Sequence, residues 1–159
     1  MAQVAGRTFA PPRGMECADL TARKVHQYAV VGVAALALLL GGTLGAALVT
    51  VDGAIMLLGR FWGPADLFRQ LVWRVAEPRG WLAPWPVPEE LGTRRIARVL
   101  GGVALFAAGA ALYTQNLLLA LGIALPLCAM ILFDASLNFC ALCFLNYQAR
   151  RLRYLLTNR

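Results

Sequence analysis

The chain has few charged residues, and acidic residues are the scarcest of them. Of the 159 residues, 14% are charged, 8 are Asp or Glu and one is His. A soluble globular domain has about 25% charged residues, so an ordinary water-soluble domain is excluded. The chain also lacks any run of more than two basic residues, although it carries 15 Lys and Arg. Proteins that follow a phosphate backbone need a basic stripe, so we expect no nucleic-acid partner.

Apolar residues take the place of the missing charge. They make up 60% of the chain, and the mean hydropathy is +0.64, which excludes disorder and indicates that much of the apolar surface faces a lipid bilayer. A helix needs about 20 apolar residues to cross a bilayer. Four charge-poor stretches are candidates, and they run over about 28–40, 44–61, 96–113 and 117–145. We therefore predict an all-α integral membrane protein with four transmembrane helices.

The four predicted helices form two hairpins, because only short uncharged turns separate the members of each pair. The turns are 41–43 and 114–116. The chain then divides into an N-terminal tail, a first transmembrane hairpin, a connector, a second hairpin and a basic C-terminal tail, at residues 1–24, 25–62, 63–93, 94–147 and 148–159. As an alternative, the first stretch could be the apolar region of a signal peptide. Cleavage would leave an odd number of spans.

The basic residues predict the orientation of the helices. Lys and Arg near the ends of spans are retained in the cytoplasm. All 15 lie in the two tails, in the connector or at the helix ends beside them, and neither turn carries a charge. We therefore expect both termini and the connector on the cytoplasmic side. The net charge of +7 then reports topology and an attraction to anionic lipid.

The connector combines an amphipathic stretch with a Pro- and Trp-rich stretch. Apolar residues recur at helical spacing between Pro64 and Val75, which predicts a short helix in the membrane interface. Tryptophans lie at 73, 81 and 85, and prolines lie at 84, 86 and 88. Tryptophan is enriched at headgroup depth. Pro88 with the two acids after it is typical of a helix start, so we expect a helix to begin there and to continue into the third span.

Two acidic residues, Asp52 and Asp134, fall inside predicted spans. A carboxylate in hydrocarbon costs at least about 2.5 kcal/mol, so each needs an explanation. A faint internal repeat sets Val51-Asp52 beside Phe133-Asp134. The pair could serve as a proton relay or ion site. Alternatively, each carboxyl is neutral or hydrogen-bonded across the helix interface. Asp134, for instance, could bond to Ser136 or Asn138 on its own helix, or to a partner helix.

The most distinctive local pattern is a CxxC pair, Cys140 and Cys143, which we expect on the fourth helix. Positions i and i+3 share one side of a helix. The pair could be a reactive dithiol, two small packing residues, or half of a metal site with Cys17 and His26. The last pattern matches no standard zinc motif, so we expect no metal. The predicted cytoplasmic side disfavours a stable disulfide, and we expect Cys128 to be an apolar filler.

The closing Phe139-Cys140-x-x-Cys143 motif, the basic entry to the first helix and the 63–74 connector resemble the bacterial membrane family called domain of unknown function 4395. The likeness covers roughly residues 22–147. It implies the bacterial cytoplasmic (inner) membrane but no established activity, and it suggests a thioredoxin-like or rhodanese-like partner. A weaker, local likeness to the vitamin K epoxide reductase fold rests on the CxxC alone, because the second cysteine pair of that fold is absent.

Three functional hypotheses follow. The first is a non-catalytic subunit or stabilising partner of a larger membrane complex, such as a respiratory or photosynthetic one, with no cofactor of its own. The second is a membrane thiol-redox or sulfur-handling protein that uses Cys140 and Cys143. The third is a small transporter, which would rest on Asp52 and Asp134 alone, whereas Asn138 is a further intramembrane polar residue. The first does not require an enzyme, and in it the thiols would be dispensable.

Overall fold

The structure is a computed structural model that describes residues 3–4, 7–8, 16–89, 91–138 and 140–157, with the backbone alone at 3–4, 7–8, 16, 89, 91, 93, 141–143, 146 and 150. Two small antiparallel sheets accompany the helices in this part of the chain. The elements are β1 (Gln3–Val4), β2 (Arg7–Thr8), β3 (Glu16–Asp19), α1 (Leu20–Leu40), α2 (Gly42–Phe61), η1 (Gly63–Ala65), α3 (Leu67–Leu71), η2 (Val72–Ala76), β4 (Pro86–Glu89), α4 (Leu91–Tyr113), α5 (Leu117–Leu137) and α6 (Ala141–Thr157). The predicted all-α class is confirmed.

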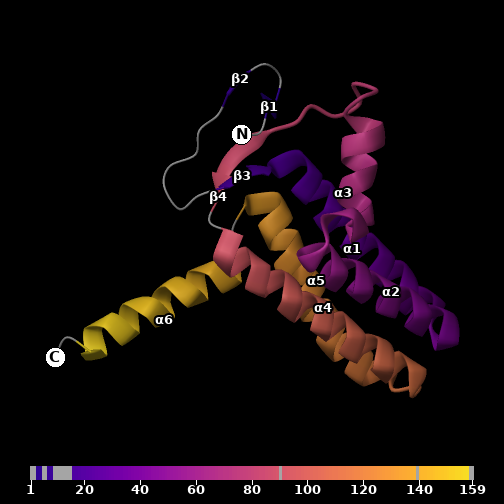
Figure 1. Cartoon of the computed structure of the whole chain (residues 1–159). Helices are drawn as coiled ribbons and strands as arrows, with labels where there is room; N and C mark the ends of the chain where they lie inside the picture. The colour runs from indigo at the N-terminus through magenta and orange to yellow at the C-terminus, as the bar shows by residue number, and fades with distance from the viewer. Residues whose placement is uncertain (1–2, 5–6, 9–15, 90, 139, 158–159) are drawn as a thin grey trace.

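Four of these helices are long and apolar enough to cross a membrane, namely α1, α2, most of α4, and α5. They lie together as a bundle (Figure 1), with both turns at one end and the connector at the other. Between α1 and α2, Gly41 and Gly42 have φ values of 61° and 54°. Residues with a side chain adopt this left-handed region at a cost, which explains glycine at the turn.

Small residues allow the helices to approach closely. The contact between α2 and α4 is the most extensive one between two elements, and it contains Gly53 and Gly102. A Cβ atom on Gly53 would lie 3.0 Å from the Gly102 carbonyl oxygen, and a Cβ atom on Gly109 would lie 2.5 Å from Thr50 Oγ1. The glycines and alanines of α4 therefore serve packing inside this chain, as is usual for helices in a bilayer.

The core of the bundle is made of small side chains, and the large apolar ones point outward. Alanine dominates the buried cluster, which also holds Val30, Val49, Met56, Leu105 and Cys128. Many leucines and aromatic residues of the same helices are exposed, for example Leu39 at 85% and Leu118 at 84%. This arrangement suits a lipid surrounding. Cys128 packs as the expected apolar filler.

The connector differs from the prediction at its C-terminal end. In the stretch where a short helix was expected, the connector forms the short helical segments α3 and η2. The proline-rich stretch does not begin a helix at Pro88, because residues 86–89 form β4, which pairs antiparallel with β3. Proline is tolerated in such an edge strand because its missing N–H can face outward. Sequence reasoning missed this strand pair, which ties the segment before α1 to the connector.

The fourth span also ends earlier than predicted. α5 stops at Leu137, and Asn138 adopts a left-handed conformation with φ of 54°. Asparagine is one of the few non-glycine residues that end a helix in this way. A separate helix, α6, then begins at Ala141 and runs away from the bundle (Figure 1). The CxxC motif was expected on the fourth span, but it lies beyond the end of that span. Cys140 precedes α6, and Cys143 lies in the first turn of α6.

Candidate functional site: a basic pocket at the end of the bundle

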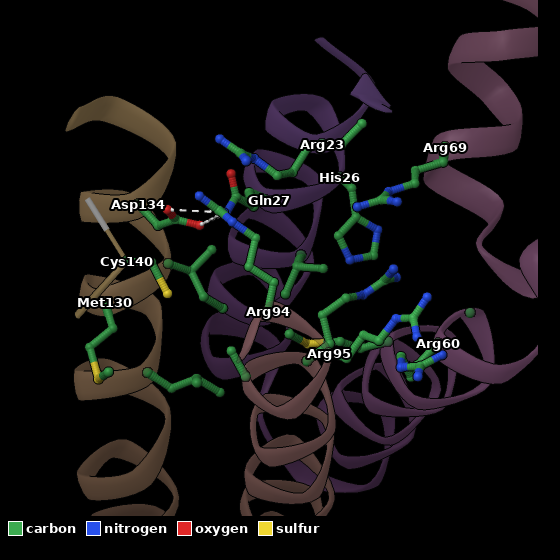
Figure 2. A pocket seen from close by; sticks show the side chains of 18 residues that line it. Arg23, His26, Gln27, Arg60, Arg69, Arg94, Arg95, Met130, Asp134 and Cys140 are labelled. Atoms are coloured by element: carbon green, nitrogen blue, oxygen red, sulfur yellow. Dashed lines mark hydrogen bonds and ion pairs between the residues drawn. The ribbon is translucent and has the colours of Figure 1, made fainter. Parts of the chain in front are cut away.

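A cavity of about 280 Å³ lies at the end of the bundle opposite the two turns. It is surrounded by α1, α2, α4, α5, the connector and the residue that precedes α6 (Figure 2). We call it the basic pocket, because its lining includes His26 and six arginines, which are Arg23, Arg60, Arg69, Arg94, Arg95 and Arg98. Among the described lining residues, Asp134 is the one carboxylate. The pocket thus concentrates positive charge.

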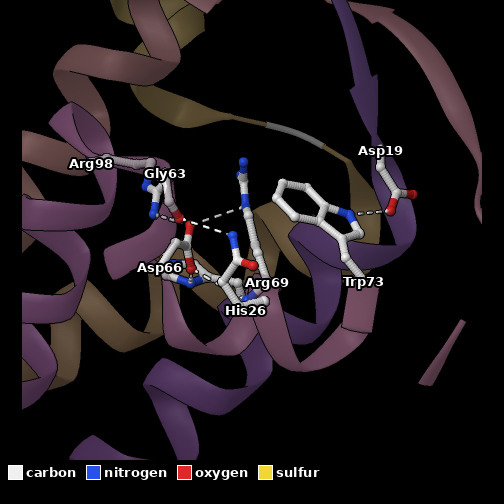
Figure 3. Close-up of polar contacts among 8 residues, drawn as sticks. Asp19, His26, Gly63, Asp66, Arg69, Trp73 and Arg98 are labelled. Atoms are coloured by element: carbon white, nitrogen blue, oxygen red, sulfur yellow. Dashed lines mark hydrogen bonds and ion pairs between the residues drawn. The ribbon is translucent and has the colours of Figure 1, made fainter. Parts of the chain in front are cut away.

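Asp66 is not part of the pocket lining, but it contacts three basic residues that are. Its carboxylate is 2% exposed and lies 2.6 Å from Arg98 Nη2, 2.9 Å from His26 Nδ1 and 3.3 Å from Arg69 Nε (Figure 3). These contacts join α1, the connector and α4. Burial by itself would raise the pKa of Asp66, but the hydrogen bond and charge of His26, together with Arg98, lower it to about 2. Asp66 is therefore ionised at neutral pH.

A glycine makes room for Asp66. A Cβ atom on Gly59 would lie 2.9 Å from Asp66 Cβ and 3.0 Å from Asp66 Cα. Distances of this kind are closer than van der Waals contact, so a side chain at 59 would push the connector away from α2. The last turn of α2 and the start of α3 thus approach closely because of this single residue.

Asp134 organises the opposite side of the basic pocket. Its carboxylate accepts hydrogen bonds from Arg94 Nη1, at 3.2 and 3.4 Å to the two oxygens, and from Gln27 Nε2 (Figure 2). The three residues belong to α5, α4 and α1. Beside them, Arg23 Nη2 donates to Asn138 Oδ1 at 3.4 Å. The described partners of Asp134 thus come from other helices, which is one of the alternatives that the sequence left open.

His26 is deeply buried beside the connector. Its side chain is 3% exposed. Its ring meets Phe68 edge-on, with centroids 5.6 Å apart. Its Nε2 atom has no hydrogen-bond partner among the described residues, and a buried polar atom without a partner is costly.

The structure separates the two intramembrane acids. Asp134 lines the basic pocket, whereas Asp52 lies on α2, is 1% exposed, and has no hydrogen-bond partner for either carboxyl oxygen in the described part of the chain. Asp52 is not among the residues that line the pocket. No contact in the described part of the chain joins the two acids.

The cysteines are spread over the structure. Cys140 is half-buried and lines the basic pocket, and its carbonyl accepts the first-turn hydrogen bond of α6 from Phe144 N at 3.0 Å. The side chain of Cys143, and Phe139 altogether, lie outside what the structure describes. Cys17 is on β3. Among the described residues, no three His, Cys, Asp or Glu side chains are grouped to hold a metal ion.

Sequence reasoning missed Gln27, Asp66 and Arg98 as members of the site. A signal was present for two of them. Arg94 and Arg98 are four residues apart and so share one face of a helix, at the boundary between a basic and an apolar stretch. Asp66 precedes the amphipathic run of the connector, where an acid is favoured as a helix cap. Nothing in the sequence indicates that these elements meet.

The family comparison covers most of the chain. A family model described as Domain of unknown function (DUF4395) matches residues 19–151. No curated protein matches the chain, and no solved structure does.

Proposed function

The chain belongs to the DUF4395 family, and we propose that it is a multi-pass membrane protein that binds an anionic ligand in its basic pocket. One observation carries the proposal. Six arginines from four different elements line a single cavity, and two carboxylates, Asp66 and Asp134, hold several of them in place. Arginine presents a planar set of donors that matches phosphate and carboxylate groups. The arrangement suits binding rather than bond making.

Arg60 and Arg95 test this proposal, because both line the basic pocket and the ion pairs of Asp66 and Asp134 are made with other basic residues. The double variant Arg60→Gln with Arg95→Gln should lose affinity for anions. Its unfolding midpoint without anions is the check that the fold is kept. Arg79→Gln is the matched control, because Arg79 is exposed and stacks on Trp81 outside the pocket.

The measurement is the thermal unfolding midpoint of the purified protein in neutral lipid nanodiscs, with and without anions. We would add inorganic phosphate, or replace part of the phosphatidylcholine by phosphatidylglycerol. A ligand that binds the folded state raises the midpoint. Either anion should raise it for the wild type and for Arg79→Gln, and much less for the double variant. If neither anion shifts the unfolding midpoint of the wild type, the proposal is contradicted.

We place the basic pocket, both termini and the connector on the cytoplasmic side of the bacterial inner membrane, with two hairpins crossing the bilayer. The distribution of Lys and Arg supports this orientation. Single cysteines introduced at Thr43 and Thr114, in the two turns, should react with a membrane-impermeant maleimide in intact cells. A cysteine at Arg79 should react only after the membrane is opened. The reverse pattern would overturn the orientation.

Thiol chemistry is a second candidate, favoured by the position of Cys140 in the basic pocket. Reactive cysteines occupy electropositive, partly exposed surroundings. In this reading, the Cys140 thiolate attacks the disulfide of a thioredoxin-like partner, forms a mixed disulfide and releases the other partner sulfur as a thiolate. Cys143 would then resolve the mixed disulfide. A Cys143→Ser variant should accumulate the mixed disulfide, and a Cys140→Ser variant should not.

The role of a non-catalytic subunit or stabilising partner in a larger membrane complex is supported by α6. This helix leaves the bundle (Figure 1), and Phe144, Leu145 and Leu152 are exposed on it. A pull-down in mild detergent should recover a stoichiometric membrane complex with the full chain, and lose it when residues 141–159 are removed. The double variant Cys140→Ser with Cys143→Ser should keep the complex. Recovery of the protein alone would argue against this role.

A further inference from the structure

The basic pocket has an apolar wall as well as a charged one. Val30 of α1, Met56 of α2, and Leu127 and Ile131 of α5 line it together with the arginines. Val30 is 1% exposed and Met56 is 7% exposed, so this wall continues into the core of the bundle. A small hydrated anion would satisfy the arginines but would leave the apolar wall in contact with water, which is unfavourable.

The apolar wall also reaches the outer surface of the bundle. Met130 lines the basic pocket and is at the same time 38% exposed. Phe133, which is three residues further along α5 and therefore next to Met130 on the helix surface, is exposed at 58%. Because α5 is a candidate membrane span, this surface faces lipid when the helix crosses the bilayer. A hydrocarbon chain can therefore pass from the bilayer along Met130 to the pocket, and methionine adapts readily to such a chain.

The charged side of the pocket is built before any ligand arrives. Asp134 fixes Arg94 and Gln27, and Asp66 fixes Arg98. Donors that are held in place lose little entropy when they bind. A polar headgroup would thus meet a prepared set of donors, at the end of the spans where headgroups lie.

Resting on the proposed function, we infer that the ligand is an anionic amphiphile: a phosphate-bearing headgroup joined to a hydrocarbon chain, taken from the surrounding leaflet. The arginines hold the headgroup, and the first carbons of the chain lie along the apolar wall. The cavity of about 280 Å³ is slightly smaller than typical ligand pockets, which span about 300–1,000 Å³. It therefore holds the headgroup and the start of the chain, while the remainder stays in the bilayer. Basic pockets between membrane helices bind anionic headgroups in this way.

Cys140 provides a direct readout of occupancy, because it lines the pocket. The test uses the full chain with Cys17→Ser, Cys128→Ser and Cys143→Ser, reduced and placed in nanodiscs. We would measure the rate at which Cys140 reacts with a small maleimide. The discs contain either phosphatidylcholine alone, phosphatidylcholine with phosphatidylglycerol, or phosphatidylcholine with inorganic phosphate in the buffer.

Phosphatidylglycerol should slow the labelling of Cys140 roughly tenfold, as expected when several charge-assisted contacts hold a ligand over it, and inorganic phosphate should slow it much less. The protection should disappear in Arg60→Gln with Arg95→Gln and persist in Arg79→Gln. It should weaken in Leu127→Gln, which makes the apolar wall polar, although the effect of inorganic phosphate on the unfolding midpoint of that variant should not change.

The outcomes separate this inference from the proposed function. Equal protection by inorganic phosphate and by phosphatidylglycerol would overturn the amphiphile and leave an anion site. Equal labelling in discs with and without phosphatidylglycerol, together with an unfolding midpoint that responds to phosphate, would do the same. The labelling rate in detergent is a further reference. Labelling that is slower in discs than in detergent, and equally slow with and without phosphatidylglycerol, would overturn the requirement for negative charge. If no anion changes either the labelling or the midpoint, both proposals fall.

Discussion

Arg98 Nη2 lies 2.6 Å from Asp66 Oδ2, and this contact joins α4 to the connector through a carboxylate that is 2% exposed. Arg98 belongs to α4, and Asp66 is the residue before α3. His26 of α1 contacts the same carboxylate at 2.9 Å. The connector is therefore clamped onto the bundle by one acid and three bases from different parts of the chain.

Replacing Asp66 by Asn should loosen this clamp. Removing one partner of a buried charge pair costs about 3–5 kcal/mol, because the other charge remains buried without compensation. We expect a marked fall in the unfolding midpoint of Asp66→Asn. Glu77→Gln is the control, because Glu77 is also in the connector but burial and the neighbouring Asp19 raise its pKa, so the loss of its charge should be harmless. Equal midpoints for Asp66→Asn and wild type would refute the clamp.

The clamp also predicts how stability depends on pH. The pKa of Asp66 is lowered to about 2 in the folded protein, against 3.8 for the free group. The unfolded chain therefore binds the proton more readily, so the contribution of Asp66 is complete above about pH 4 and is lost as pH falls toward 2. The difference in midpoint between wild type and Asp66→Asn should shrink over that range. A difference that stays constant from pH 5 to pH 2 would show that the ionised form is not involved.

Gly59→Ala should be destabilising because of the close approach to the connector. Its new Cβ would lie 3.0 Å from the backbone of Asp66, and overpacking of this kind typically costs about 1–3 kcal/mol. Gly32→Ala is the matched control on α1, since a Cβ there has no neighbour within 4 Å. Alanine favours helix over glycine by up to about 1 kcal/mol, so the control should be neutral or more stable. The unfolding midpoints of the two variants decide the matter.

The two intramembrane acids should respond differently to the same substitution. Asp134→Asn removes the charge that pairs with Arg94, so it should lower the unfolding midpoint and weaken anion-dependent stabilisation. Asp52→Asn replaces a buried carboxyl group that has no hydrogen-bond partner in the described part of the chain, so it should leave the midpoint unchanged or raise it. A comparable loss in both variants would revive the idea that the two acids act as a pair.

Composition was enough to predict the membrane helices, but not the site. Hydropathy marks the four spans because the bilayer acts on each helix independently. The basic pocket depends instead on contacts between distant segments, such as Gln27 with Asp134. The basic residues from which the orientation was predicted also supply the arginines of the pocket. From the sequence alone these two roles of Arg94 and Arg98 could not be separated.

The errors at element ends have a common physical origin. α5 was expected to continue to about 145 because Leu142, Phe144 and Leu145 extend the apolar run. The left-handed conformation of Asn138 ends the helix instead. Likewise, Pro88 next to acids is typical of a helix start, but pairing with Cys17 makes it part of a strand. In both places a local signal for helix was overridden by a turn or by a distant partner.

The pairing of β3 with β4 has a consequence for biogenesis. β3 precedes the first two spans in the chain, and β4 follows them. During synthesis the ribosome must release both spans and most of the connector before β3 can find its partner. Insertion of the first pair of helices therefore precedes completion of this sheet, and the segment ahead of α1 waits unpaired through that interval. Shortening the connector would then hinder the final folding step and leave insertion itself unaffected.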